Sequence, residues 1–403
     1  MTAAATHTLF DAILKKTIDT LGAAGAAVYL GDPDRPVLRL AATLGQRAAD
    51  GAPWPVEMAW GKESAGGGAA EPVTEVENDR AVLTVPLLLG EDEVGAVIVS
   101  SGARVFGGVD TDDLALQFRA LARALAPDPL TALRDELARR IPLPAREWLE
   151  AGIAAAARGE RDTILTAFPA MGRRLGREPL GSRSALVPRD VDLDVPLRSW
   201  RVDDAGRVAL LCGFVGDAET LARELYFTGD LRERCGALRG LAVLGRTPGA
   251  IDAVRDAVRS SAGELFEAAL ADNPYAGRFL PDDEFRHAVL KAAFVGVSIA
   301  RVPGVEARAD AELSRMLLSY VTEREVAGRS VPPDIWPVVA LHPTRGLAGK
   351  LCGYLEHPAT AHRAAAAQAL GRIGDRRAHA FLNDRLARED DPTVRRLLER
   401  ALA

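Results

Sequence analysis

From Leu130 to its last residue, this sequence of 403 residues consists almost entirely of helical segments. Apolar residues recur at three- and four-residue spacings, and Gly, Pro or capping residues separate the segments. The expected helices are Thr131–Arg140, Ala145–Arg158, Asp162–Leu175, Asp203–Val215, Ala218–Leu225, Asp230–Leu244, Gly249–Ser260, Ala262–Ala271, Glu284–Val297, Ala309–Arg324, Pro333–Val339, Thr344–Leu355, Thr360–Ile373, Arg377–Arg388 and Pro392–Ala403. This part must therefore be an all-α array. Only Pro179–Trp200, rich in Pro, Asp and Arg, is expected to be an ordered loop packed on helices.

The last part of the chain contains an internal repeat. HRAAAAQAL (His362–Leu370) recurs 32 positions later as VRRLLERAL (Val394–Leu402), and Asp391-Pro392 starts the second copy. The phrase resembles HEAT-like repeats of the phycobilisome-lyase type. A repeat of this length predicts helical hairpins stacked on one another. A weaker echo, RCGALRGLAVLGR (Arg234–Arg246), extends the helical-repeat interpretation to the middle of the chain.

Before Ala126-Pro127-Asp128-Pro129 the pattern is mixed. Period-2 apolar runs alternate with helical ones, and the GEDE sequence between two of the runs is a hairpin signal. The expected order is a helix at Leu9–Leu21, strands at Ala26–Leu30 and Val37–Ala42, an aperiodic Gly/Ala-rich stretch at Ala52–Ala70, strands at Ala81–Leu89 and Val94–Ser100, and a helix at Leu114–Leu125. This order predicts a small α/β domain.

Residues 5–126 resemble GAF domains. The most specific stretch is Ala81–Ala126, where a "VPL" strand, a hairpin, a "GAVIV" strand and an "F…DDL" helix start follow one another. The resemblance implies a domain that binds a small ligand or dimerises. No Cys precedes position 212, which excludes covalent attachment of a bilin, and Asn78-Asp79-Arg80 is too short for a cyclic-nucleotide signature.

The charge distribution argues against a nucleic-acid partner. Residues 1–126 carry 10 basic and 17 acidic side chains, and the other 277 residues carry 40 and 39, for a net charge of −6. Neither part has the basic excess that a phosphate-binding surface needs. The aromatic fraction of 5% means that the cores are built mainly from Ala, Leu and Val.

The cysteines and the apolar runs indicate a cytoplasmic protein. Cys212, Cys235 and Cys352 are odd in number and widely spaced, which suits small buried hydrophobic residues better than a disulfide framework or a zinc module. The N-terminal residues lack the pattern of a signal peptide. The longest apolar runs, such as Ala81–Leu89, are too short to cross a bilayer, so we expect no membrane insertion.

The most individual stretch of the sequence is Leu265–Gly296, hereafter the signature stretch. It reads as helix, turn, helix, because Asp272-Asn273-Pro274 is a strong helix stop and Pro281-Asp282-Asp283 suits a helix start. On the second helix, Asp283, His287 and Lys291 are spaced four apart and share one face.

That polar face has three interpretations. Asp283 and His287 could be half of a metal site, although nothing marks a third ligand. Lys291, one of five lysines, could contact an anion or act in catalysis. The third interpretation is a polar ladder that joins this helix to the loop Asp272–Leu280. No metal and no cofactor is expected.

The signature stretch resembles the core phrase of the EboA family, bacterial proteins described as metabolite-traffic proteins. The matching positions are Phe266, Glu267, Ala268, Asn273, Pro274, Tyr275, Val289, Leu290, Lys291, Ala292 and Phe294. Phe285 replaces a Trp of the family, and Arg286-His287 replace an Asn-Gln pair. The resemblance covers about residues 140–345, and it implies an all-helical protein linked to trafficking of secondary-metabolite precursors and without assigned catalytic residues.

These observations predict an α+β multidomain protein: a GAF-like α/β sandwich (1–126), an EboA-like all-helical domain (130–345) and HEAT-like repeats (346–403) of an α-solenoid. The expected function is that of a non-enzymatic accessory protein that binds a partner protein, a metabolite or both, with a homodimer possible through the GAF-like domain. The candidate binding residues are Asn273, Tyr275, Asp283, His287 and Lys291. Two alternatives stay open: an enzyme that uses Lys291 or His287 on a carbonyl or phosphate-bearing metabolite, and a pure protein scaffold.

Overall fold

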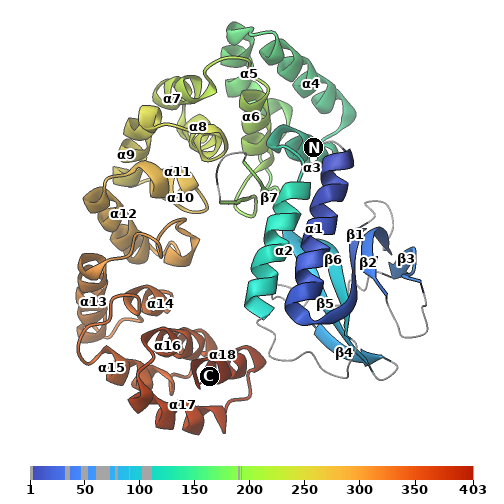
Figure 1. Cartoon of the computed structure of the whole chain (residues 1–403). Helices are drawn as coiled ribbons and strands as arrows, with labels where there is room; N and C mark the ends of the chain where they lie inside the picture. The colour runs from blue at the N-terminus through green and yellow to red at the C-terminus, as the bar shows by residue number, and fades with distance from the viewer. Residues whose placement is uncertain are drawn as a thin grey trace. The chain divides into compact units, whose positions relative to one another are not determined.

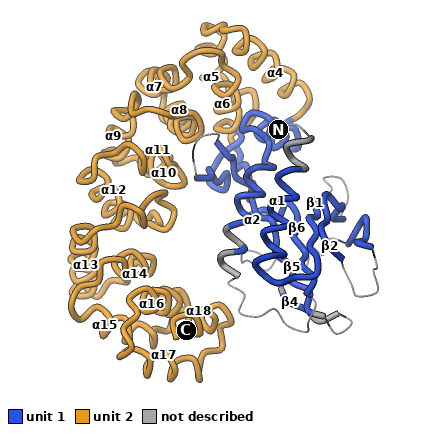
Figure 2. The backbone as a smooth tube through the Cα atoms, viewed as in Figure 1, with its two compact units in different colours: residues 1–141, 178–202 blue, residues 142–177, 203–403 orange. Residues whose placement is uncertain are grey.

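The protein divides into two compact units, shown in a computed structural model in Figures 1 and 2. The structure describes residues 3–31, 37–46, 53–59, 73–77, 80–89, 91–101, 111–188, 191 and 193–402. One unit consists of residues 1–141 and 178–202, and the other of residues 142–177 and 203–403. The chain therefore leaves the second unit after its first helices and returns to it twenty-five residues later.

The first unit is built on a six-stranded antiparallel sheet with the strand order β3-β2-β1-β6-β5-β4. Its elements are α1 (Ala3–Leu21), β1 (Ala23–Gly31), β2 (Val37–Gly45), β3 (Glu57–Ala59), β4 (Val73–Glu77), β5 (Arg80–Leu89), β6 (Asp92–Ser101), α2 (Thr111–Leu125) and α3 (Pro129–Ala138). In register, Val97 on β6 is paired with Val28 on β1 and with Val85 on β5. The predicted order of helices and strands is confirmed, and the β5–β6 hairpin lies where GEDE indicated it.

Two helices cover one face of this sheet (Figure 1). Leu14 of α1 and Phe118 of α2 are buried against Val28, Val85 and Val97, because alternate strand residues point to the same face. The opposite face has a second cluster that includes Tyr29, Trp54 and Ile98. Two strands, β3 and β4, were not predicted. Most of the aperiodic stretch 52–70 lies outside the described residues.

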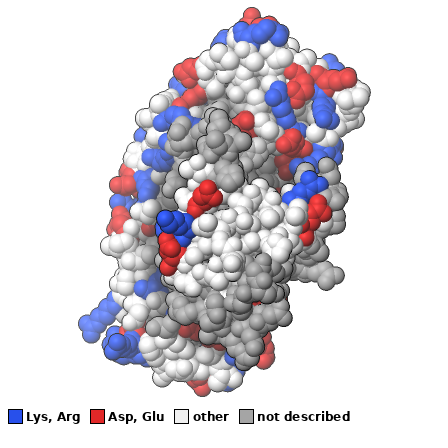
Figure 3. Space-filling model, turned by 45° about the vertical axis from the view of Figure 1, so that its right-hand side comes forward, with Lys and Arg blue, Asp and Glu red and all other residues white. Residues whose placement is uncertain are grey.

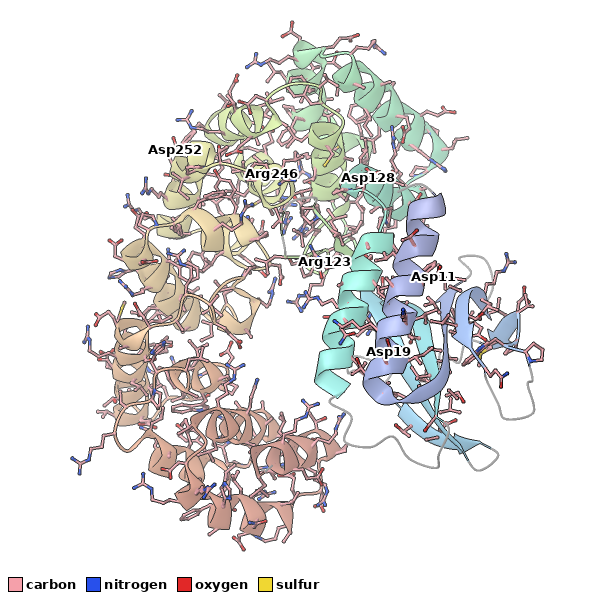
Figure 4. All side chains as sticks on the ribbon, viewed as in Figure 1. Asp11, Asp19, Arg123, Asp128, Arg246 and Asp252 are labelled. Carbon is pink, nitrogen blue, oxygen red and sulfur yellow. The ribbon has the colours of Figure 1, made fainter. Side chains whose placement is uncertain are left out.

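The segment 179–200 belongs to the first unit, and its described residues, 179–188, 191 and 193–200, form no helix, which agrees with the predicted loop. It also contains a strand pair that was not predicted, β7 (Ala185–Leu186) with β8 (Val195–Pro196). Arg123, labelled on α2 in Figure 4, donates to the Val191 carbonyl oxygen (2.7 Å) and pairs with Asp194. Arg140 donates to the Leu180 carbonyl oxygen (2.6 Å). These contacts hold the loop to the helices of the same unit.

The second unit is an array of helices that follow one another in chain order (Figure 1). They are α4 (Leu143–Ala157), α5 (Arg161–Arg174), α6 (Val202–Cys212), α7 (Ala218–Thr228), α8 (Leu231–Leu244), α9 (Ile251–Arg259), α10 (Gly263–Leu270), α11 (Pro274–Phe279), α12 (Asp282–Val295), α13 (Ala311–Val326), α14 (Ile335–Val339), α15 (Leu347–Tyr354), α16 (Thr360–Ile373), α17 (His379–Leu386) and α18 (Pro392–Leu402). An outer row contains α7, α9, α12, α13 and α15, and an inner row contains α8, α10, α14 and α16. This is the architecture of a helical-repeat array.

Capping residues set the helix starts in this unit. Asp217, Asp230 and Asp310 each accept a hydrogen bond from the backbone N–H three residues later, which satisfies one of the free donors of a first turn. The predicted repeat is present, since α16 and α18 pack on each other with α17 between them in sequence. The packing is close: a Cβ added at Gly371 of α16 would lie 3.2 Å from Ala401.

Charged side chains of both signs are visible on one face of the protein (Figure 3). On the face shown in Figure 3, acidic and basic side chains of the described residues gather in small groups of both signs. No described helix of the protein is both long and apolar enough to span a bilayer. Cys235 and Cys352 are buried, as predicted, whereas Cys212 is half-buried.

Candidate functional site

The signature stretch folds into three helices, α10, α11 and α12, rather than two. The predicted stop is present, because Asp272 adopts a left-handed backbone conformation with φ of 56°. This conformation is unfavourable for a residue with a Cβ. Asp272 is held in it by Arg301, whose guanidinium donates to Oδ2 at 2.6 and 2.9 Å and whose carbonyl oxygen accepts from the Asp272 N–H at 2.7 Å.

Asn273 joins three helices and is only 2% exposed. Its Nδ2 group donates to the carbonyl oxygens of Leu238 on α8 (3.1 Å) and Ala268 on α10 (2.8 Å). Its Oδ1 accepts from the Tyr275 N–H at the start of α11 (3.0 Å). Both amide hydrogens are therefore bonded within the protein, and the side chain links α8, α10 and α11.

Tyr275 is 1% exposed and anchors α11 to the turn between α8 and α9. Figure 4 labels Arg246 in this turn and Asp252 in the first turn of α9. The Tyr275 hydroxyl lies 2.8 Å from the Thr247 carbonyl oxygen and accepts from the Ala250 N–H at 3.0 Å. Burial is the main reason why the pKa of the Tyr275 phenol is raised above its ordinary value. Gly245 is required here, because a Cβ would lie 2.2 Å from the Tyr275 ring.

Asp283 and His287 lie on the exposed side of α12. The Nδ1 atom of His287 lies 2.7 Å from the backbone carbonyl oxygen of Asp283, one helical turn earlier. The carboxylate of Asp283 is not the group that His287 contacts. Among the described residues no group of three or more His, Cys, Asp or Glu side chains is arranged to hold a metal ion.

Lys291 binds the end of a neighbouring helix. Its Nζ atom donates to the carbonyl oxygens of Val258 and Ser260, both at 2.7 Å, at the C-terminus of α9. A cation at this end of a helix satisfies free carbonyl groups and faces the negative end of the helix dipole. The ammonium also lies 4.8 Å from the centroid of the Phe266 ring. Desolvation lowers the pKa of Lys291.

The five predicted residues thus separate into two groups. Asn273 and Tyr275 are internal, whereas Asp283, His287 and Lys291 follow one side of α12. The interpretation of a polar ladder to the loop Asp272–Leu280 is wrong. Lys291 reaches the end of α9 instead, and the Asp272 end of the loop is held to α10 by Arg301, which binds Asp272 and also Glu267 (2.6 Å).

A groove of about 470 Å³ lies between α12 and α13, hereafter the α12/α13 groove. It is lined by His287, Leu290, Lys291, Phe294, Arg315, Met316, Ser319, Tyr320 and Glu323. Both helices belong to the outer row in Figure 1. Two of the predicted residues, His287 and Lys291, are therefore brought to one surface, where they meet side chains of a second helix.

Phe294 is the most unusual residue of this groove because its ring is 72% exposed. Its centroid lies 6.3 Å from that of Tyr320, whose hydroxyl donates to the Ala293 carbonyl oxygen (3.0 Å) and so fixes its ring. Apolar contact area is thus displayed on a fixed support. Sequence reasoning missed Phe294 as a site residue, although it follows His287 by seven positions and Lys291 by three, which places all three on one helix face.

The lining of the groove contains charged residues of both signs. Arg315 is paired with Glu312 through two hydrogen bonds of 2.6 and 2.8 Å on the surface of α13. Besides His287, the basic residues of the groove are Lys291 and Arg315, and Glu323 is the one carboxylate among its lining residues. The arrangement suits a ligand with an apolar body and an acidic group.

A buried ion-pair cluster near the start of α6 was also missed. The helix expected from Asp203 begins at Val202, as α6, and the carboxylates of Asp203 and Asp204 in its first turn are fully buried. Asp203 accepts from Arg207 (2.5 Å) and from Arg232 (3.2 Å), and Asp204 accepts from Arg232 (2.9 Å) and pairs with Arg239. Because each charge is paired, the cluster serves to hold α6 and α8 together.

The sequence matches two family models. The model described as "Metabolite traffic protein EboA" matches residues 130–340, and a model for HEAT repeats matches residues 339–403. The comparisons do not confirm the resemblance of residues 5–126 to GAF domains. No curated protein and no solved structure matches the chain. The signature stretch and the α12/α13 groove both lie inside the first of the two matched regions.

Proposed function

The chain belongs to the EboA family of metabolite traffic proteins, and on this premise we propose that it is a non-enzymatic accessory protein that binds a small metabolite in the α12/α13 groove. The observation that carries the proposal is the exposure of Phe294 inside a groove of about 470 Å³. Ligand pockets in proteins combine such an apolar lining with a few polar groups that fix orientation.

The polar groups of the groove indicate the class of metabolite. Leu290, Phe294 and Met316 offer an apolar surface, and Lys291 and Arg315 offer positive charge. A largely apolar molecule with one carboxylate or phosphate would use both. His287, which is exposed at the same surface, can donate or accept a hydrogen bond.

The contacts of Lys291 favour binding over catalysis. A lysine that attacks a carbonyl group must present a free, neutral amine. The Lys291 Nζ atom donates instead to two backbone carbonyl oxygens, so it is not free to attack a substrate, although desolvation lowers its pKa. We therefore prefer the accessory role to an enzyme that acts through Lys291 or His287. The printed family name, which describes traffic of metabolites, suggests the same.

A protein partner is the second element of the proposal. The HEAT repeats at residues 339–403 suggest protein interaction, since stacked helical hairpins form extended binding surfaces. We propose that a cytoplasmic partner docks on these repeats while the metabolite occupies the α12/α13 groove. In the first unit, the order of elements and the two helices on one sheet face support a GAF-like domain for dimerisation or sensing.

Native mass spectrometry of the freshly purified full chain tests the metabolite directly. A non-covalent excess mass that disappears on denaturation is the expected result. The Phe294→Ser variant should lose that mass, because the substitution removes the exposed ring. The matched control is Phe381→Ser, which changes a phenylalanine of α17 that is also exposed (56%) but lies outside the groove.

A fluorescent probe supplies a second test when no ligand is retained. Anilinonaphthalene sulfonate has an apolar body and an anionic group, and it should bind the α12/α13 groove with a rise in fluorescence. Phe294→Ser should weaken this binding about fivefold or more, which corresponds to about 1 kcal/mol. Equal binding by the wild type, Phe294→Ser and Phe381→Ser would contradict the proposed site. Analytical ultracentrifugation of the same samples tests the homodimer.

A further inference from the structure

A second pocket of about 300 Å³ lies where α13, α15 and α16 meet. Its lining includes Glu325 and Arg329 from the end of α13 and the following turn, and Lys350 and Tyr354 from α15. His357 and His362 complete it. The first two residues fall in the region matched by the EboA model and the other four in the region matched by the HEAT model. The pocket thus belongs to the joint between the two matched regions.

Three rings form one wall of this pocket. The rings of Tyr354 and His357 are nearly parallel, with an interplanar angle of 10° and centroids 6.0 Å apart. The His362 ring lies 3.9 Å from His357 and 5.6 Å from Tyr354, measured between centroids. A wall of planar rings favours a planar ligand, because stacking buries the flat apolar surface of the ligand and that of the protein ring.

His362 has an unsatisfied polar atom. The residue is 6% exposed, and its Nδ1 atom is buried and has no hydrogen-bond partner among the described residues. An unpaired buried nitrogen costs free energy unless a water molecule or a ligand satisfies it. In His357, Nδ1 accepts from the Ala359 N–H (3.1 Å), so the neutral ring carries its hydrogen on Nε2 and has a donor to offer.

The pocket has more basic than acidic side chains, so one basic group has no acidic partner in the described part of the chain. Glu325 is its carboxylate, and it is already used: Lys350 donates to Oε2 (2.5 Å) and the Tyr354 hydroxyl donates to Oε1 (3.0 Å). The guanidinium of Arg329 is exposed and makes no hydrogen bond or ion pair with the described residues. An anion entering the pocket would therefore meet a positive group that has no internal partner.

We propose that this pocket binds a small aromatic or heteroaromatic carboxylate. The ring of the ligand packs against Tyr354 and His357, and its carboxylate accepts hydrogen bonds from the Arg329 guanidinium. An Arg–carboxylate pair is planar and can be bidentate, which fits a planar acid better than a spherical ion. The site is separate from the α12/α13 groove and does not depend on the function proposed for it.

A ligand bound in the pocket would stabilise the contact between the two matched regions of the chain. The ligand would contact Arg329, beyond the end of α13, and Tyr354 and His357, at and beyond the end of α15. A ligand that binds only the folded arrangement stabilises it according to its concentration and affinity. Binding at this site would thus hold the HEAT repeats in one orientation relative to the helices that precede them.

Isothermal titration calorimetry of the full chain tests the proposal with four probes. Benzoate and nicotinate carry a ring and a carboxylate, cyclohexanecarboxylate lacks the aromatic ring, and benzamide lacks the charge. We expect the two aromatic acids to bind, cyclohexanecarboxylate to bind several-fold more weakly, and benzamide to bind weakest. Arg329→Gln should weaken benzoate binding about tenfold, since it removes one charge-assisted pair.

Two controls make the result decisive. Arg345→Gln changes another exposed arginine outside the pocket and should leave benzoate binding unchanged. Phe294→Ser, in the α12/α13 groove, should leave it unchanged as well, so that failure of one site is distinguishable from failure of the other. Absence of benzoate binding at millimolar concentration would overturn the proposal. Binding that is equally strong in Arg329→Gln, or equally strong for benzamide, would overturn it too.

Discussion

The two halves of the signature stretch are used in opposite ways. In the first half, Asn273 and Tyr275 are buried and their polar groups are bonded to other parts of the chain. In the second half, His287 and Phe294 are exposed, and Lys291 lies beside them in a groove. One half builds the array of helices, and the other half is displayed on its surface.

The difference teaches how a family phrase should be read. Asn273 and Phe294 both match the EboA phrase, and the sequence alone does not show which of the two residues is buried. Burial separates them, because a side chain whose hydrogen bonds are all internal can support a site but cannot contact a ligand. The predictions below test this division, and the variants that open their paragraphs are taken in order of decreasing effect on stability.

Replacing Asn273 by Ala should destabilise the second unit by about 3 kcal/mol. The change leaves the carbonyl oxygens of Leu238 and Ala268 without their donor, and each unpaired buried group costs about 1–3 kcal/mol. Hydrogen exchange of the amides in α8 and α11 measures the loss. Asn383→Ala is the control, since that asparagine is exposed and bonds only within its own helix. Equal effects of both substitutions would break the comparison.

Tyr275→Phe should cost about 1–3 kcal/mol, measured by the same exchange experiment. The ring remains in place, but the Thr247 carbonyl oxygen and the Ala250 N–H lose their partner. Tyr320→Phe removes a single bond to the Ala293 carbonyl oxygen and should cost less. If Tyr275→Phe left the free energy of unfolding unchanged, the buried contacts of the first half of the stretch would not stabilise the fold.

Alkaline pH should reduce the contribution of the Tyr275 hydroxyl to stability. The pKa of Tyr275 is raised above its ordinary value of 10, mainly by burial, so the folded protein keeps a proton that the unfolded chain releases. The stability that this provides is full below pH 10 and is lost as pH rises toward the folded-state pKa. The stability difference between wild type and Tyr275→Phe should therefore be constant from pH 7 to about 9.5 and narrow above 10. A difference that stays constant up to about pH 11.5 would contradict this assignment.

Lys291→Met should cost about 1 kcal/mol. Methionine retains packing on Phe266 but cannot donate to the carbonyl oxygens of Val258 and Ser260. Faster hydrogen exchange confined to the last turn of α9 is the expected sign. The same variant should bind the anilinonaphthalene probe more weakly, because a cation of the α12/α13 groove is gone. Lys16→Met, at an exposed position of α1 and outside the lining of both pockets, should bind the probe like wild type.

Phe294→Ser should change stability by less than about 0.5 kcal/mol, because the ring is already exposed to water. The matched change in the first half, Phe266→Ala, removes a fully buried ring and should cost about 3–5 kcal/mol. Thermal unfolding of both variants measures the contrast. A strongly destabilised Phe294→Ser would show that the groove is closed in solution.

Much of the fold could be predicted from local patterns. The helices of the second unit have a clear period, and Asp272-Asn273-Pro274 marks the helix stop correctly. Short elements were not predicted, because α11 has six residues and β4 has five, which is too few for a periodic pattern to be evident. The buried ion pairs of Asp203 and Asp204 were not predicted, since an acidic pair at a helix start is usually exposed.

The candidate site could be predicted only in part, for a physical reason. Spacing places His287, Lys291 and Phe294 on one face of a helix, but it does not say which element lies opposite. Lys291 meets Ser260, thirty-one positions away, and Phe294 meets Tyr320, twenty-six positions away. Such pairings follow from the packing of whole helices and have no signal in a single sequence.

The path of the chain between the two units has a consequence for inheritance. Residues 178–202 belong with residues 1–141, yet in the gene they lie between the codons of α5 and those of most of α6. A single recombination breakpoint after codon 126 or 141 would deliver the sheet without the loop to which Arg123 and Arg140 are bound. A fragment that ends at either point is therefore expected to contain a less stable sheet unit than the full chain does.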